Sequence, residues 1–394
     1  YLLAQELISL PFDKANIELI WFCKYRCFKY MNSLGFNKLE KDTKVVVAMS
    51  GGVDSSVAAV MLKLEGYDVT GITLKLYTSN SHSNNKTCCA GTDIEDAKKV
   101  ANKYNFKHIT LDYQDKFYEG VINNFIDSYS NGETPLPCVQ CNQTVKFKDL
   151  LIEAKKMGAD ALVTGHYARR EGSLTKASLH KAKDLSKDQS FFLFATKQDQ
   201  LNYVRFPLGN YNKSEIRNLA KKYELDVSTK PDSQDICFVT SDTYRNLINK
   251  LNPETQKKGN IFNLKGELIG IHDGISNYTI GQRRGIGISG SKEPLYVIDI
   301  NKKNNSITLG SRKNLKKNII KFKNINWLGG DIISSNIECT AKIRSTQQDL
   351  PGLLEIKDDF GTFTFNAELD GTSPGQACVF YKNDQLLGGG WITA

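Results

Sequence analysis

The sequence predicts an α/β domain on a parallel, Rossmann-like sheet, followed by small β-rich domains, the last of them a β-barrel. Two observations predict the first part: short apolar runs alternate with helical patterns from residue 44 onward, and a glycine-rich turn follows the first run. Such alternation favours a parallel sheet covered on both faces. The second part is predicted by a change near residue 245, after which short β-rich runs replace the long helical patterns.

The expected elements follow from the spacing of apolar residues. Residues 45–49 form a short apolar run, as in a buried parallel strand. Val57, Val60, Met61 and Leu64 then recur on one face of a helix. Further strands are expected at 69–74, 108–111, 161–164, 294–300, 306–309, 338–344 and 377–381, and further helices at 94–104, 147–154 and 216–223.

We expect four segments along the chain. These are an N-terminal extension over residues 1–40, a catalytic domain over 41–244, a central β-rich domain over 245–312 and a C-terminal β-barrel over 313–394. The first 30 residues contain no start methionine, and Met31 opens a more regular stretch. We interpret them as a dispensable extension, with a helix docked on the catalytic domain as the alternative.

The charge balance indicates a polyanionic partner. The 394 residues include 52 Lys and Arg against 43 Asp and Glu, a net charge of +9. Residues 301–323 hold a run of basic residues without an acid, either a solvated linker or a strip that contacts phosphates. A composition of 40% hydrophobic and 24% charged residues excludes a disordered or coiled-coil chain. Lacking an apolar run of about 18 residues or a secretory leader, the chain is expected to be a cytoplasmic monomer without a membrane partner.

A glycine-rich loop is the strongest functional signal. Residues 50–56 read Ser-Gly-Gly-Val-Asp-Ser-Ser, between an apolar strand and an amphipathic helix. The glycines let the backbone approach an anion, and the helix N-terminus supplies partial positive charge. The loop lacks the Gly-Lys-Ser/Thr ending of a Walker A loop. It suits a grip on pyrophosphate, with ATP split between its α and β phosphates to activate a carbonyl oxygen as an adenylate. A turn that binds no ligand is the alternative.

Nine cysteines, an odd number, favour reactive or metal-binding thiols over a disulfide framework. Cys138 and Cys141 lie on an expected loop before a helix, where the thiol pKa should fall. Cys237 lies far along the chain. If the sheet brings these loops together, one thiol can carry sulfur as a persulfide while the second attacks the S–S bond.

Other interpretations of the cysteines stay open. Cys138 and Cys141 with Cys88 and Cys89 could hold zinc, although their spacing is irregular. Cys138, Cys141 and Cys237 could hold an iron–sulfur cluster, which we do not favour. The remaining cysteines are expected to be small core residues: Cys23, Cys27, Cys339 and Cys378.

Together, these features resemble the tRNA-specific 2-thiouridylases of the PP-loop ATP pyrophosphatase superfamily. Six motifs carry the resemblance, run in the family's order and span most of residues 44–394. They are Met49–Ser56, Cys141-Asn142 with Lys146-Phe147, Thr164–Arg169, Lys187–Ser190, Asp235–Phe238 and Tyr278–Gly285.

The resemblance implies ATP-dependent 2-thiolation of the wobble uridine, position 34, in tRNAs such as those for Glu, Gln and Lys, and a tRNA-binding role for the central domain. The implied ATP contacts are Ala48, Met49, Ser50, Gly51, Gly52, Val53, Asp54, Ser55, Leu74 and Gly165. The implied tRNA contacts are Leu136, Pro137, Cys138, His166, Lys187, Asp188, Gln189, Arg283, Arg344 and Gln376.

By the same resemblance, Cys141 is the nucleophile and Cys237 the persulfide carrier, and the two form a transient disulfide. Cys138 departs from the family, because some members have an acid/base aspartate there. Either a phosphate oxygen or water takes the proton instead, or Cys138 does so as a thiolate. A cysteine desulfurase or sulfur-carrier protein is the implied donor. Mg²⁺ is expected with ATP. No carboxylate cluster in the sequence fixes its site, so Asp54 is a candidate ligand, and no resident metal site is predicted.

Two other functions are consistent with the loop alone. One is a PP-loop amide or C–N ligase that acts on a small metabolite, which needs neither a cysteine pair nor basic β domains. The other is a non-catalytic RNA-binding protein with a relic loop, which Asp54 and the thiols argue against. Several implied tRNA contacts also have structural alternatives: a structural histidine at His166, a capped helix start at 187–190 and an exposed charged turn at 282–284.

Overall fold

The computed structural model describes residues 31–77, 91–232, 236–239, 244–288, 293–330 and 336–393. Cys23, Cys27, Cys88, Cys89 and most of the expected N-terminal extension therefore lie outside the described residues, as does Asp235 of the cysteine motif. Within residues 31–40, Leu34 and Phe36 are buried in the same apolar cluster as Val45 and Val47. Among the described residues, none of the helices has the length and apolar character needed to cross a membrane.

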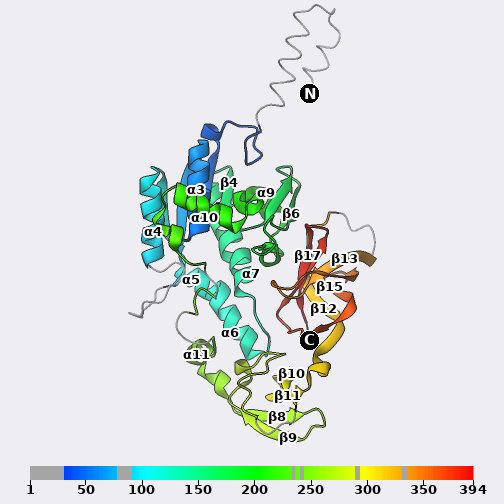
Figure 1. Cartoon of the computed structure of the whole chain (residues 1–394). Coiled ribbons are helices and arrows are strands. Elements are labelled where there is room, and N and C mark those ends of the chain that lie inside the picture. The colour runs from blue at the N-terminus through cyan, green and yellow to red at the C-terminus, as the bar shows by residue number, and fades with distance from the viewer. Residues whose placement is uncertain are drawn as a thin grey trace, which may run out of the picture.

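A five-stranded parallel sheet forms the first domain, which confirms the predicted fold class (Figure 1). The strand order is β3-β2-β1-β4-β7. The strands are β1 Lys44–Ala48, β2 Asp68–Lys75, β3 Lys107–Asp112, β4 Ala161–Thr164 and β7 Val204–Arg205. Alternate residues of β1 belong to different hydrophobic clusters, Val45 and Val47 to one and Val46 to the other, so apolar layers cover both faces.

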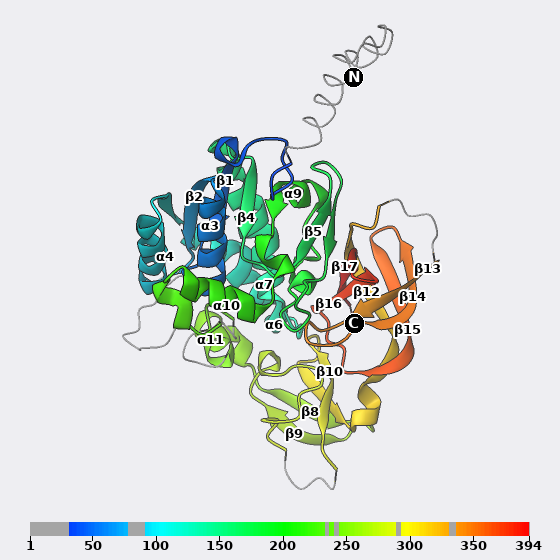
Figure 2. The ribbon, with the colours of Figure 1, turned by 45° about the horizontal axis from the view of Figure 1, so that its top comes forward.

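Two groups of helices supply those layers (Figure 2). One face carries α3 Val53–Glu65, α4 Gly91–Lys103 and α10 Lys213–Lys222. The other carries α5 Gln114–Phe117, the π-helix η3 Tyr118–Ile122, α6 Asn123–Ser130, α7 Pro137–Cys141, the π-helix η4 Asn142–Leu150 and α8 Leu151–Lys156. The remaining α-helices described are α9 Gln198–Tyr203 and α11 Tyr244–Leu251. Tyr244 of α11 stacks on Tyr129 of α6, with ring centroids 4.8 Å apart.

A four-stranded sheet and a closed barrel follow, as the β-rich patterns predict. The sheet has the order β10-β11-β8-β9, with β8 Gly259–Asn263, β9 Leu268–His272, β10 Tyr296–Asn301 and β11 Ser306–Gly310. The barrel has the order β12-β15-β14-β13-β16-β17 and closes where β17 pairs with β12. Its strands are β12 Lys316–Trp327, β13 Asn336–Lys342, β14 Leu350–Lys357, β15 Phe360–Asp370, β16 Ala377–Lys382 and β17 Gln385–Ile392.

The barrel core confirms one prediction about cysteines and corrects the linker interpretation of the basic run. Cys339 and Cys378 are buried in this core. Residues 301–323 are not a linker, because they contain β11 and the first two thirds of β12. Along β12 the exposed Lys321 and Lys323 alternate with the buried Ile320 and Phe322, since successive side chains of a strand face opposite sides. The sequence did not reveal this alternation of apolar and polar residues, because so many of the residues in the run are lysines.

A hairpin from the first domain extends the barrel sheet, which the sequence did not indicate. The hairpin strands are β5 Arg169–Gly172 and β6 Ala177–His180, and β6 pairs with β17 through Leu179 and Leu386. In Figures 1 and 2 these strands lie beside the barrel. The first domain and the barrel are therefore joined by backbone hydrogen bonds as well as by side chains.

A charged cluster lies next to this junction. The Lys181 ammonium lies 2.6 Å from Asp349 Oδ1 and 4.6 Å from the ring centroid of Tyr381. The Tyr381 hydroxyl lies 3.1 Å from Ser190 Oγ, and Lys342 lies over the same ring. Since Tyr381 is fully buried, its hydroxyl is satisfied by Ser190 instead of by water.

Replacing Asp349 by Ala is expected to lower the free energy of unfolding by about 3 kcal/mol, because it leaves a nearly buried ammonium without its carboxylate. Only 11% of the Lys181 side chain is exposed. The double variant Lys181→Met/Asp349→Leu removes both charges and should be closer to the wild type. Urea titrations of the three proteins would check this, and a double variant less stable than Asp349→Ala would contradict it.

Candidate active site

The glycine-rich loop lies between the end of β1 at Ala48 and the start of α3 at Val53. It lies where the sheet order changes direction, with β2 on one side of β1 and β4 on the other, which is the usual ligand-binding edge of such sheets. Gly51 has a φ of +72°, and a Cβ there would lie 2.1 Å from the Asp93 carbonyl oxygen. Gly51 is therefore required by conformation and by space.

The serines of the loop hold its turn together. The Ser50 amide donates to Ser55 Oγ at 3.1 Å, and Ser55 Oγ donates to the Gly52 carbonyl at 3.3 Å. Ser56 Oγ is buried and has no hydrogen-bond partner among the described residues. The first amides of α3 also lack partners within the helix, so the loop presents donors suited to an anion.

Asp54, in the first turn of α3, is held by two donors. Lys213 Nζ lies 2.8 and 2.7 Å from the two carboxylate oxygens, and the Tyr167 hydroxyl donates at 2.8 Å. Burial, reinforced by the Asp54 charge, raises the pKa of Tyr167, so this hydroxyl stays a donor. Lys213 also lies 2.9 Å from Asp232, so a single ammonium joins two carboxylates.

Asp232 is the second anchor of this network. It accepts hydrogen bonds from Lys187 at 2.9 Å and Arg217 at 2.7 Å, in addition to its pair with Lys213. Burial alone would raise the pKa of Asp232, but the hydrogen bonds from Lys213 and Lys187 outweigh it and lower that pKa to about 2. Sequence reasoning missed Lys213 and Arg217, although their spacing at i and i+4 on a helix was a readable signal.

Gly165, directly after β4, contacts the loop from the other side. A Cβ at Gly165 would lie 2.9 Å from the Ser55 amide nitrogen. The close neighbour of Gly165 is thus the backbone of α3. Leu74 is buried near the end of β2, and Ala48 is partly buried at the end of β1. Both lie at the same edge of the sheet.

The structure corrects the setting of Cys138 and Cys141. They do not precede a helix but belong to α7, because Pro137 already occupies its first turn. Cys138 is exposed and Cys141 is buried. Burial raises the pKa of the Cys141 thiol, with Lys146 acting in the opposite direction, so the expected fall is wrong for Cys141. Desolvation of the thiolate outweighs the helix N-terminus.

Cys141 lies beyond the carboxyl end of β4. The helical stretch α7–η4–α8 leads into β4, and Phe147 within it contacts His166, just past β4, at 6.0 Å between ring centroids. Cys141 lies six residues before Phe147 along the same helical stretch, farther from β4 than Phe147 is. Cys237 is half-buried, and its carbonyl accepts a hydrogen bond of 2.7 Å from Tyr77, just past β2. Both cysteines therefore lie at the edge that carries the glycine-rich loop.

Cys237 and Cys141 also share one apolar cluster, in which Cys141 is a core member and Cys237 packs against the outside. Phe238 fixes the stretch of chain that carries Cys237, here called the cysteine segment (residues 232–239). The ring centroid of Phe238 lies 5.7 Å from that of Phe117 and 5.2 Å from that of Phe125. Among the described residues, no three His, Cys, Asp or Glu side chains gather as a metal site, so the three cysteines considered for an iron–sulfur cluster are not assembled in this structure.

Four of the expected tRNA contacts make internal hydrogen bonds. His166 Nδ1 lies 2.7 Å from Thr164 Oγ1, and burial between aromatic rings lowers the pKa of His166 well below its usual value, which keeps it neutral. Lys187 pairs with Asp232 as above. Asp188 accepts the amides of Ala182 and Ser190 at 3.1 Å, and Gln189 Oε1 accepts the amide of Tyr167 at 2.8 Å.

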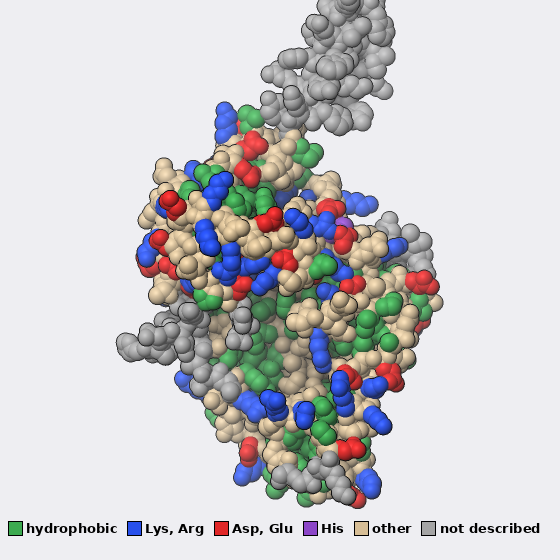
Figure 3. Space-filling model, viewed as in Figure 1, with side chains coloured by type: hydrophobic (Ala, Val, Ile, Leu, Met, Phe, Trp, Pro, Cys, Tyr) green, Lys and Arg blue, Asp and Glu red, His purple; other side chains and the backbone are tan. Residues whose placement is uncertain are grey.

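Other expected contacts lie where the first domain, the central part with the four-stranded sheet, and the barrel meet. Gln376 Nε2 donates to the Thr134 carbonyl at 3.0 Å, just before Leu136 and α7, and Ser373 Oγ lies 3.3 Å from the Ile280 carbonyl oxygen. Arg283, close to Ile280, is exposed. Figure 3 shows Lys and Arg side chains on the catalytic part and on the β-rich part of one face, with an apolar stretch between them.

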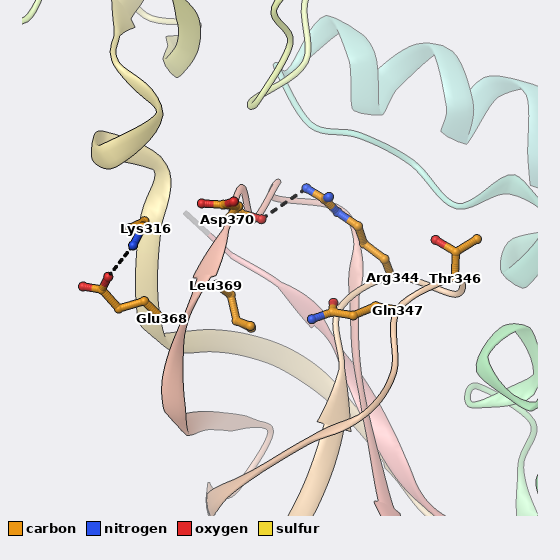
Figure 4. Close-up of a pocket in the computed structure, with 7 residues that line it drawn as sticks. All are labelled: Lys316, Arg344, Thr346, Gln347, Glu368, Leu369 and Asp370. Atoms are coloured by element: carbon orange, nitrogen blue, oxygen red, sulfur yellow. Dashed lines mark hydrogen bonds and ion pairs between the residues drawn. The ribbon is translucent and has the colours of Figure 1, made fainter.

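Arg344 lines a cavity of about 410 Å³ at one end of the barrel (Figure 4). Its guanidinium donates to the Gly371 carbonyl at 2.5 Å. The other lining residues are Lys316, Thr346, Gln347, Glu368, Leu369 and Asp370.

Comparisons with known proteins cover nearly all of the chain. Family models match residues 43–241 as a "tRNA methyl transferase HUP domain", 246–311 as a "tRNA methyl transferase PRC-barrel domain" and 317–392 as an "Aminomethyltransferase beta-barrel domain". A tRNA-specific 2-thiouridylase MnmA of Rickettsia canadensis is 52% identical over 90% of this chain and 97% of its own. One of Rhodospirillum centenum is 49% identical over 92% of this chain and 94% of its own.

A solved structure of the U34-tRNA thiolase NcsA from Methanococcus maripaludis, with its [4Fe-4S] cluster, is also similar. It is 18% identical, covers 60% of this chain and 72% of its own, and has a TM-score of 0.35. A similarity this low carries no argument about this chain.

Alkylation of Cys141 by iodoacetamide in the ligand-free protein should reach half its maximal rate above about pH 8.5, the usual thiol pKa, because burial disfavours the thiolate. Lys146→Met should move this midpoint higher, since the Lys146 charge lowers the pKa of Cys141. Lys148→Met, at an exposed position of the same helix, is the matched control. Peptide mass spectrometry gives the rates, and a midpoint at or below about pH 8 would contradict the assignment.

Gly165→Ala should weaken ATP binding at least about tenfold, because the added Cβ pushes the start of α3 away from its place beside β4. The matched control is Gly91→Ala, where the added Cβ meets no atom of the described residues within 4 Å. Isothermal titration of both variants with ATP measures the effect. Equal affinities for the two variants would show that the close contact at Gly165 does not shape the loop.

Proposed function

The chain belongs to the tRNA-specific 2-thiouridylase family, and from this premise we propose that it activates O2 of the wobble uridine with ATP and replaces that oxygen with sulfur from a cysteine persulfide. That the protein is an enzyme of tRNA thiolation follows from its relatives, which are about half identical over nine-tenths of the chain. The observation that supports the finer chemistry is the common location of the glycine-rich loop, Cys141 and Cys237 at one edge of the sheet.

The first step spends ATP to create a leaving group. Uridine O2 attacks the α-phosphate and pyrophosphate departs, so O2 becomes part of an adenylate. The amides of the loop and of the α3 N-terminus stabilise the charge that develops on the phosphates. Mg²⁺ is commonly held by one or two carboxylates together with substrate phosphates. Asp54 would hold it here through a lone pair that Lys213 and Tyr167, which bond its two oxygens, leave unused. When bound, the ion neutralises phosphate charge.

The second step transfers sulfur. The terminal sulfur of a persulfide on Cys237 attacks C2 of the uridine, and AMP leaves with the oxygen. The Cys141 thiolate then attacks the Cys237 sulfur, which breaks the S–S bond to the substrate and leaves 2-thiouridine and a Cys141–Cys237 disulfide. A dithiol reductant must reopen this disulfide before a donor reloads Cys237. Because burial raises the pKa of Cys141, substrate binding must expose or polarise this thiol.

The tRNA is proposed to bind across the meeting point of the three parts. Arg283 and Arg344 present guanidinium groups there, and Leu136, Pro137 and Cys138 lie at the start of α7 beside the loop that holds Gln376. Guanidinium groups bind phosphates and stack on bases. We propose Glu, Gln and Lys tRNAs as substrates, a desulfurase or sulfur-carrier protein as donor, and a cytoplasmic monomer as the acting form.

Cys141→Ser and Cys237→Ser should each abolish 2-thiouridine formation in lysine tRNA, because each removes a sulfur atom that the transfer requires. Cys339→Ser, in the barrel core, is the matched control and should retain activity. Mass spectrometry of tRNA nucleosides after reaction with purified protein provides the measurement. Full thiolation by the Cys237→Ser protein would refute the assignment, and AMP formation that depends on an amino acid but not on tRNA would favour a ligase.

A further inference from the structure

Lys230 connects the glycine-rich loop to α4. Its ammonium donates to the Gly51 carbonyl oxygen at 3.0 Å and to Asp96 Oδ2 at 3.0 Å, and it also bonds Asp93. Asp93 is buried, with 5% of its surface exposed. Burial alone would lower the pKa of Lys230, but its bonds to Asp93 and Asp96 outweigh this and raise that pKa, so the ammonium keeps its charge.

The contact with the Gly51 carbonyl matters because the peptide group between Gly51 and Gly52 can otherwise rotate. Gly51 and Gly52 are adjacent residues without a Cβ, and a peptide plane between two glycines rotates at little steric cost. The described chain contains no cis peptide bond. In a trans peptide the carbonyl and the following N–H point in opposite directions. A carbonyl drawn toward Lys230 therefore turns the Gly52 N–H away from α4.

We propose that Lys230 is a positioning residue for the phosphate loop: by fixing the Gly51 carbonyl, it presents the Gly52 amide to the β and γ phosphates of the nucleotide. Gly52 is the N-cap residue of α3, so its amide adds to the donors at that helix start. The proposal rests on the proposed function only in taking the anion to be part of ATP. It assigns Lys230 no contact with the substrate.

The same contact has a second consequence. Lys230 and Asp232 begin the stretch of chain that leads to Cys237, and both are bound to the nucleotide loop, Lys230 through Gly51 and Asp232 through Lys213 and Asp54. The start of the cysteine segment is thus fastened to the loop that holds ATP.

The test uses two probes that report on different parts of the nucleotide site. Lys230→Met should weaken binding of inorganic pyrophosphate about tenfold, the effect of one lost hydrogen bond to a charged group. Binding of adenosine should change by less than about twofold, because the loop amide does not contact the base. Lys230→Arg, which can still donate to the Gly51 carbonyl, should recover most of the pyrophosphate affinity. Lys221→Met, at an exposed lysine of α10, is the matched control.

Isothermal titration of the full chain measures both probes, and circular dichroism verifies folding. Should Lys230→Met fail to fold, Lys230→Gln, whose amide is a shorter and neutral donor, takes its place and should show a partial loss of pyrophosphate binding. Equal weakening for pyrophosphate and adenosine would show a general structural role and overturn the proposal, as would unchanged pyrophosphate binding. Because neither probe requires tRNA or sulfur, the result stands apart from the outcome of the thiolation assay.

Discussion

The ion pairs around Lys213 hold together the parts of the site that the chain supplies from distant positions. One ammonium joins Asp54 of the nucleotide loop to Asp232 of the cysteine segment, and Tyr167 after β4 completes the contact. Only 11% of the Lys213 side chain is exposed, so water screens these charges weakly and their attraction is stronger than at the surface. Without this ammonium, two carboxylates would repel each other at the site that must accept a polyphosphate.

Sheet topology determines where the network can form. Parallel strands bring their carboxyl ends to one edge, and the change of direction at β1 opens a space there. Gly51 and Gly165 permit the close backbone contacts that draw α3, α4 and the end of β4 around that space. Apolar packing then fixes the thiols: Phe238 anchors the segment of Cys237, and burial raises the pKa of Cys141. The positions of both thiols at this edge therefore depend on the apolar cluster that covers one face of the sheet.

The sequence predicted the sheet, the loop and the cysteines because each leaves a local signal. The run 45–49 and the glycines at 51 and 52 can be recognised without knowledge of tertiary contacts. Other features depend on partners distant in the chain. The pKa of Cys141 could not be foreseen, since burial is decided by helices from elsewhere, and β12 was obscured by its exposed lysines. Lys230 and Lys213 resemble any surface lysine until Gly51, Asp93 and Asp54 are placed beside them.

The hairpin β5–β6 belongs to the first domain in sequence, but its strands extend the sheet of the barrel. A fragment that ends before β12 would leave β6 as an open sheet edge, which promotes aggregation, and would leave the Lys181 ammonium without its carboxylate. A fragment that begins at β12 would lack the strand that covers part of β17. The catalytic part and the barrel thus share a strand pairing and a buried ion pair, so truncation between them is a poor way to separate RNA capture from catalysis in this enzyme.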